Sequence, residues 1–119
     1  GAMTRLHQLC IAVLMATLLG CTPSISRDQS KRLIAASAVL LAHPEGDIPE
    51  SRWPEVVAHL NPKRVYRNHQ GVYICTYEFF VEQQGVFILD PASTFIPGRN
   101  GDPSYDVVAA GVFIYRSAG

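Results

Sequence analysis

Residues with side chains suited to catalysis are few in this chain and widely separated. Glu78 and Glu82 lie four positions apart, and a pair of carboxylates could serve as general acid and general base. No histidine accompanies this pair, and His69 stands alone as a second candidate base. The chain contains none of the G-x-S-x-G, H-E-x-x-H, P-loop or C-x-x-C patterns. We therefore expect that the protein is not an enzyme, with a hydrolase of unfamiliar site as the alternative.

Metal and thiol chemistry has little support either. The three histidines that follow residue 40 are expected at two helix ends and in a turn, so a metal site would need the fold to gather separate elements. Cys75 lies within an apolar strand, which is the setting of a small buried side chain rather than of a reactive thiol. We expect no metal and no cofactor.

The longest irregular segment spans residues 91–104 and is rich in Gly, Pro, Asn and Asp. Loops of this length are often functional or mobile. Its tip presents the hydrogen-bonding side chains of Arg99, Asn100 and Asp102, and Tyr105 stands at its base. These four residues form our candidate partner-binding site. The alternative is a turn whose residue types serve the backbone alone, while the alternating acidic ligands of a calcium loop are absent.

Two helices are expected before any strand. Ser26 followed by Gln29 has the spacing of a capping box, which predicts that the first helix begins there. Residues 33–42 are apolar on nearly every side, so this helix should be buried over most of its surface. Cap and stop residues predict a second, shorter helix over residues 51–60.

From residue 65 onward the apolar residues alternate with a period of two, which predicts strands. We expect turns at residues 69–71 and 82–85, each ending in a glycine. The fold class predicted is α+β, with two N-terminal helices packed on a curved antiparallel sheet of about four strands, in a single domain over residues 26–119. The strands are expected at residues 65–67, 72–81, 86–89 and 107–115, the last allowing a break at 109–111.

The strand expected at residues 72–81 is apolar on both faces. Two short helices cover one face of a four-stranded sheet but hardly both. Either the sheet curls and fills its own second face, or that face is a contact surface. We favour the curled sheet, because aromatic residues at strand spacing are more often core than binding site.

The beginning of the chain has the order of features found in a bacterial export signal. Residues 1–2 have the form of a protease-cleavage scar, Arg5 supplies a positive charge, and an apolar run follows over residues 9–19. The run is shorter than the about 20 residues that an apolar helix needs to cross a bilayer. Leu18-Leu19-Gly20-Cys21 closes the run, and the segment resembles the signal peptide and lipobox of bacterial lipoproteins. The alternative is a hydrophobic helix in which Cys21 is a bystander.

This resemblance implies lipidation of Cys21, removal of residues 1–20 and firm anchoring by several acyl chains. Thr22 in place of Asp after the cysteine implies the periplasmic face of the outer membrane. Residues 21–25 would then be the lipidated cysteine and a short tether, which reaches about 15 Å when fully extended and holds the domain against the membrane. With Cys10 removed and Cys21 lipidated, Cys75 would have no disulfide partner.

The charge pattern argues against some classes of partner. Ten Lys or Arg balance ten Asp or Glu, and these residues are scattered singly. The chain therefore has no basic stripe for nucleic acid and no polybasic patch for anionic lipid. We expect a small membrane-anchored periplasmic lipoprotein that binds another protein, as an immunity or inhibitor protein or as an accessory subunit of an envelope assembly. A purely structural envelope lipoprotein is a further alternative.

Overall fold

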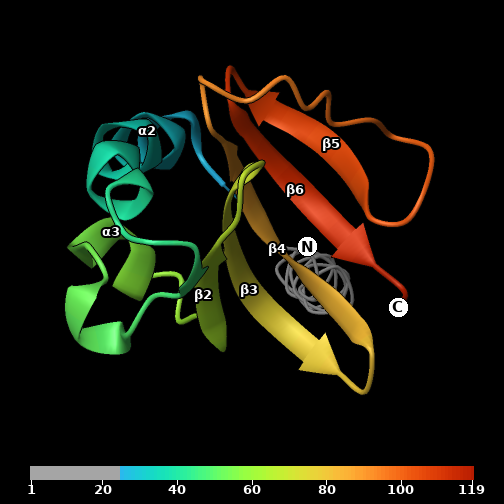
Figure 1. Cartoon of the computed structure of the whole chain (residues 1–119), viewed down its shortest axis with the longest axis horizontal. Coiled ribbons are helices and arrows are strands. Elements are labelled where there is room, and N and C mark those ends of the chain that lie inside the picture. Colours follow the sequence, from blue (N-terminus) through green and yellow to red (C-terminus); the bar gives the residue numbers. More distant parts are fainter. Residues whose placement is uncertain (1–24) are drawn as a thin grey trace, which may run out of the picture.

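A six-stranded antiparallel sheet and one long helix make up most of the fold (Figure 1). The computed structural model of the chain describes residues 25–119. The strand order is β1-β2-β3-β4-β6-β5, which confirms the α+β class. The strands are β1 (Gly46–Asp47), β2 (Arg64–Arg67), β3 (Gly71–Phe79), β4 (Glu82–Leu89), β5 (Ser104–Ala109) and β6 (Val112–Ser117).

The helix α2 (Arg27–Leu41) begins at the predicted capping box. The Ser26 hydroxyl accepts the backbone N–H of Gln29 at 3.1 Å, and the Gln29 side chain accepts the backbone N–H of Ser26 at 3.0 Å. Leu33 and Leu40 of this helix are fully buried against one face of the sheet. However, Val39 and other residues of its second half are exposed, so the helix is buried along one stripe rather than on every side.

The second helix is much shorter than predicted. In place of a helix over residues 51–60, the chain forms a 3₁₀ turn η1 (Glu50–Arg52) and the single α-helical turn α3 (Glu55–Ala58). Trp53 separates them in an extended conformation with ψ of 128°, because a residue that precedes a proline avoids the helical region. The Trp53 indole N–H donates to the Ile48 carbonyl at 2.9 Å, and the half-buried side chain packs against the aliphatic core.

The number of strands, about four by prediction, is also corrected. The return strand expected at residues 107–115 is a hairpin, since β5 and β6 reverse at the glycine of the expected break. The expected turn at residues 82–85 lies inside β4, and the chain reverses earlier, at Phe80 with φ of 54°. Gly85 serves a close approach instead of a turn, because a Cβ atom there would collide with the Ile74 carbonyl of β3.

Both faces of the sheet carry buried apolar residues. The face toward α2 and α3 carries aliphatic side chains from β2, β3, β4 and β6. The opposite face carries an aromatic cluster, in which Tyr73, Phe87, Tyr105 and Tyr115 are buried and Phe95 of the long loop packs beside them. The apolar character of β3 on both sides therefore reflects two separate cores.

The aromatic cluster fills the concave second face of the sheet, as we favoured. Tyr73 lies on β3 and Tyr105 on β5, with β4 and β6 between these strands. Three strand spacings in a flat sheet amount to about 14 Å. The two tyrosine hydroxyl oxygens are nevertheless 2.7 Å apart. The tyrosines meet across a concave face, which the sheet and the loop fill with aromatic rings.

Candidate functional site

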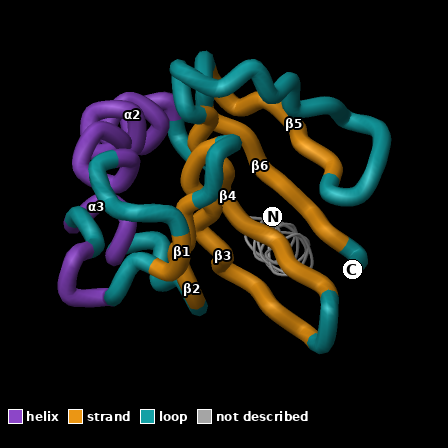
Figure 2. Tube along the Cα trace, in the orientation of Figure 1, coloured by secondary structure: helices purple, strands orange, loops and turns teal. Residues whose placement is uncertain are grey.

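The long loop after β4 presents three of the four predicted binding residues to solvent. It runs along the edge strand β5 before entering it (Figure 2), and the Tyr105 N–H donates to the Gly98 carbonyl at 2.8 Å. Arg99 Nε forms an ion pair with Asp106 Oδ1 at 3.0 Å, and an Asp102 carboxylate oxygen accepts the Ala118 N–H at 2.8 Å. Arg99, Asp102 and the neighbouring asparagine at the tip are all exposed.

Tyr105, the fourth predicted residue, is only 4 % exposed. Its hydroxyl bonds that of Tyr73, which in turn donates to Gln70 Oε1 at 2.7 Å. Because each hydroxyl has one proton and Gln70 Oε1 only accepts, the chain of bonds runs from Tyr105 to Tyr73 to Gln70. Burial raises the pKa of both tyrosines, so both hydroxyls stay protonated at neutral pH. Tyr105 therefore fixes the base of the loop rather than facing a partner.

A small open cavity of about 320 Å³ lies beneath the loop. Asn100, Asp102 and Tyr105 line it together with Gln70 and the apolar residues of the loop. Its volume is at the lower end of the about 300–1,000 Å³ typical of small-molecule sites. The cavity offers amide, carboxylate and hydroxyl groups but no histidine or thiol, so its lining supports binding better than catalysis.

The register places Glu78 and Glu82 on opposite faces of the β3–β4 hairpin, and His69 lies away from both. Glu78 and Glu82 are exposed near the turn between β3 and β4, paired across the hairpin with Gln83 and Phe79. His69 lies in the turn before β3, so about 24 Å of strand separates it from Glu78. A hydrolytic site that combined the histidine with the carboxylates therefore has no common location.

The structure also shows the surroundings of Cys75 and of the side chains that could ligate a metal. Cys75 is buried on β3, where burial raises the pKa of its thiol, and Sγ donates to the Tyr77 carbonyl at 3.2 Å. Within residues 25–119, no three or more His, Cys, Asp or Glu side chains are grouped so as to hold a metal ion.

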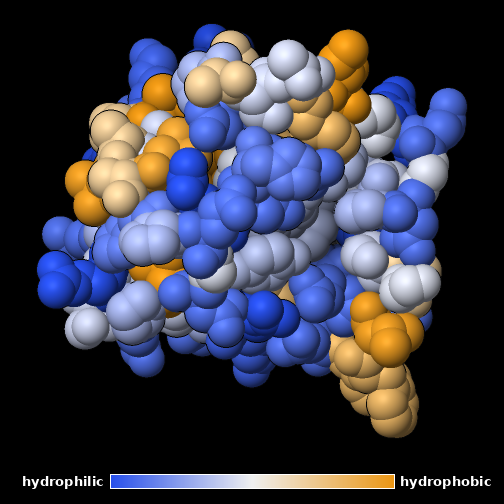
Figure 3. Space-filling model, in the orientation of Figure 1, coloured by the Kyte–Doolittle hydropathy of each residue, from blue (hydrophilic) through white to orange (hydrophobic). Residues whose placement is uncertain are grey.

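The β3–β4 hairpin carries an apolar tip that was not predicted from the sequence. Phe79, Phe80 and Val81 are 55 %, 88 % and 67 % exposed, and Figure 3 shows an apolar protrusion at the end of this hairpin. The prediction extended the strand through residue 81 and so counted these side chains as faces of the sheet. The one available signal was three consecutive bulky apolar residues beside the polar run Glu82–Gln84, which is unusual at a strand end.

The hairpin tip and the loop tip lie at the same end of the sheet. Gly119 lies against Val81, and Ala118 is bonded to Asp102 of the loop. We call this region, comprising Phe79–Val81, Arg99–Asp102 and the C-terminal residues, the hairpin end. Ile25 lies at the opposite end of β5, near Val108. The length of β4, about 24 Å, separates the two ends (Figure 1).

Comparisons with protein families, curated proteins and solved structures returned no match. Cys21, the predicted lipidation site, lies outside the described residues. Among the described helices, none combines the length and apolar character needed to cross a membrane.

Proposed function

We propose that this chain is a lipid-anchored periplasmic module that binds another protein through its hairpin end. The exposed apolar tip carries the proposal. Contiguous exposed apolar patches mark interaction sites, and Phe80, at 88 %, is the most exposed of the large apolar side chains that the structure describes. A side chain of this kind gains free energy when a partner removes it from water.

The tip has the composition of an interface centre. The Phe79 and Phe80 rings meet edge to face with centroids 4.6 Å apart, so the pair is arranged before a partner binds. Glu78 and Glu82 flank the pair, and Arg99 and Asp102 lie at the neighbouring loop. Aromatic anchors within a polar rim are typical of binding hot spots. The expected partner has an apolar pocket for two rings, with cationic groups facing the two glutamates.

The membrane anchor rests on Leu18-Leu19-Gly20-Cys21 and is part of the same proposal. A short tether at Ile25 would attach the domain by the end of the sheet opposite the tip. The hairpin end would then point away from the outer membrane and into the periplasm. This arrangement suits an immunity or inhibitor protein, or an accessory subunit that meets its partner near the membrane.

Site-specific photocrosslinking tests the binding surface. We would place benzoylphenylalanine at position 80 and, as a matched control, at Val39, which is exposed on α2 away from the tip. In native envelopes, position 80 should give one discrete protein adduct that is lost on Phe79→Ser, and position 39 should not give it. The absence of an adduct at position 80, or the same adducts at both positions, would refute the proposed surface.

The lipid anchor has its own test. Cys21→Ser should abolish the lipid mass, leave an unprocessed precursor and change the fold of residues 26–116 little. Membrane fractionation and intact mass of the natural and substituted chains measure this. An unmodified Cys21 in the natural chain would refute the anchor without touching the crosslinking result.

A further inference from the structure

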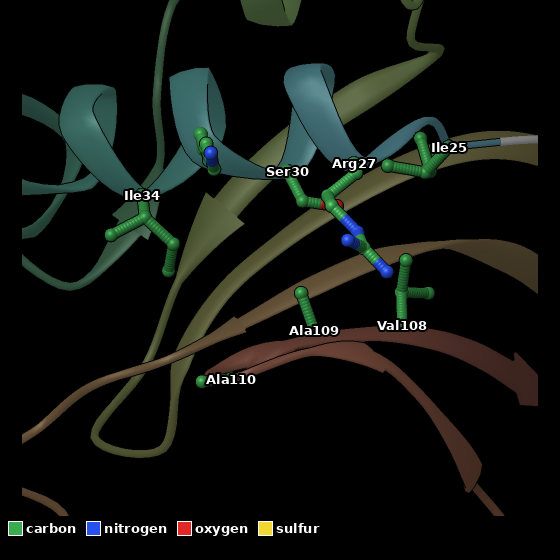
Figure 4. Close-up of a pocket in the computed structure, with 8 residues that line it drawn as sticks. Ile25, Arg27, Ser30, Ile34, Val108, Ala109 and Ala110 are labelled. Carbon is green, nitrogen blue, oxygen red and sulfur yellow. The ribbon is translucent and has the colours of Figure 1, made fainter.

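An open groove of about 700 Å³ runs between the first turns of α2 and the turn between β5 and β6 (Figure 4). Ile25, Ile34 and Val108 give it apolar walls, and Arg27 and Lys31 lie along it. In Figure 4 the Arg27 side chain extends from the helix toward Val108. Ile34 is 41 % exposed and Val108 is 36 % exposed, so the walls are accessible.

The groove combines apolar surface with two unpaired cations. Within the described part of the chain, neither Arg27 nor Lys31 forms an ion pair, and Asp28 of the same turn is paired with Arg32 at 3.6 Å. The Ser26 and Gln29 side chains already occupy backbone N–H groups at the helix start. The side-chain cations are therefore the groups free to meet an anion.

The position of the groove indicates what the anion is. Ile25 forms one wall, and Cys21 precedes it by four residues, which span at most about 14 Å. A lipid on Cys21 would hold this end of the domain at the bilayer surface. Cations beside exposed aliphatic side chains are the usual composition of a surface that rests in the headgroup region.

We infer that the groove docks onto an anionic phospholipid bilayer. Arg27 and Lys31 bind headgroup phosphates, and Ile25, Ile34 and Val108 lie among the headgroups. This inference rests on the anchor in the proposed function. Two cations contribute only about fivefold each to membrane affinity, which agrees with the lack of a polybasic patch in the sequence. The lipid supplies attachment, and the groove sets the orientation that turns the hairpin end away from the bilayer.

Photocrosslinking to lipid tests the orientation. The full chain, attached to vesicles of phosphatidylethanolamine and phosphatidylglycerol, would carry benzoylphenylalanine at position 108 or at position 81. Position 108 should give phospholipid adducts by mass spectrometry, whereas position 81, at the hairpin end, should not. The pair R27E/K31E should lower the adduct yield at position 108 by about fivefold or more. R52E, a charge reversal at an exposed site outside the groove, should leave it unchanged.

Three results would overturn the inference: lipid adducts at neither position, equal adducts at both, or a yield that R27E/K31E does not lower. Far-UV circular dichroism of each variant shows that its fold is retained. Failure of the anchor is detected by a separate measurement, because the intact mass of the natural chain shows whether Cys21 carries lipid. An unmodified Cys21 would refute the anchor and with it the premise of this inference, whereas any of the three results above with a lipidated Cys21 would refute the docking surface alone.

Discussion

Tyr73→Phe is the sharpest test of the filled concave face. The substitution keeps the ring and its contacts but removes the hydroxyl that accepts from Tyr105 and donates to Gln70. The Tyr105 hydroxyl would remain buried without a partner, at a cost of about 1–3 kcal/mol. We expect the free energy of unfolding to fall by about 2 kcal/mol, which lowers the melting temperature by about 10 °C in a domain of this size.

Tyr115→Phe is the matched control, because it deletes the same atom from the same cluster. The Tyr115 ring packs edge to face on Tyr73 with centroids 5.0 Å apart. Its hydroxyl is buried and, among the described residues, makes no hydrogen bond within 3.5 Å, with only looser polar contacts to the Cys75 and Tyr66 side chains. Removing a buried polar group that lacks a partner should leave stability unchanged or raise it slightly.

Urea unfolding followed by circular dichroism measures Y73F and Y115F. The same assay on Y105F and on the double variant Y73F/Y105F measures the coupling between Tyr73 and Tyr105. The double variant should lose less stability than the sum of the single losses, because it also removes the Tyr105 hydroxyl that Y73F leaves unpaired. If the free energies of unfolding of Y73F and Y115F differ by less than about 0.5 kcal/mol, the hydrogen bonds between the hydroxyls do not stabilise the fold. The concave face is then not a closed interior.

Three further predictions concern stability and are measured by the same unfolding assay. Gly85→Ala should lower the free energy of unfolding by about 3 kcal/mol, because its Cβ collides with the β3 backbone. Gly98→Ala, whose Cβ would meet only the Asn100 carbonyl at an ordinary contact distance, should change it by no more than about 0.5 kcal/mol. Equal losses would contradict the close approach at Gly85. Ser26→Ala should cost about 1 kcal/mol through loss of the cap, and no loss would mean that the cap is not formed in solution. Burial raises the pKa of Tyr73 and Tyr115, so they keep their protons in the folded state while the unfolded chain ionises above about pH 10. The stabilisation from these two protonated tyrosines is complete below that pH, and the free energy of unfolding should fall as the pH rises from about 9 to about 11. A free energy of unfolding that does not change over this range would refute their burial.

Local signals in the sequence predicted the elements whose ends are set by adjacent residues. The Ser26 and Gln29 pair located the start of α2, because a capping box acts within one turn. The helix predicted over residues 51–60 is too long, because Pro54 suits a first helical turn but also keeps Trp53 out of the helical region. Strand positions were predicted better than turns.

Features that depend on contacts between distant residues were beyond the sequence. Gly85 was read as a turn glycine, yet its role is set by a β3 carbonyl on the neighbouring strand. Tyr105 was read as an accessible loop residue, yet the curl of the sheet brings it to Tyr73. Of the candidate site, the exposed loop tip could be predicted from its residue types. The apolar tip at Phe80 has only a weak signal in its residue types, because strand register decides where the hairpin reverses.

The position of Trp53 has a practical consequence for studies of this protein in solution. It is the only tryptophan in the chain, and its indole, in the segment between η1 and α3, packs against the aliphatic core and is bonded to the Ile48 carbonyl. Its fluorescence emission should therefore report detachment of the helical layer and respond little to ligands at the hairpin end. Changes in emission during a titration would signal a loosening of the domain, so a fluorophore placed near the tip is needed to follow complex formation.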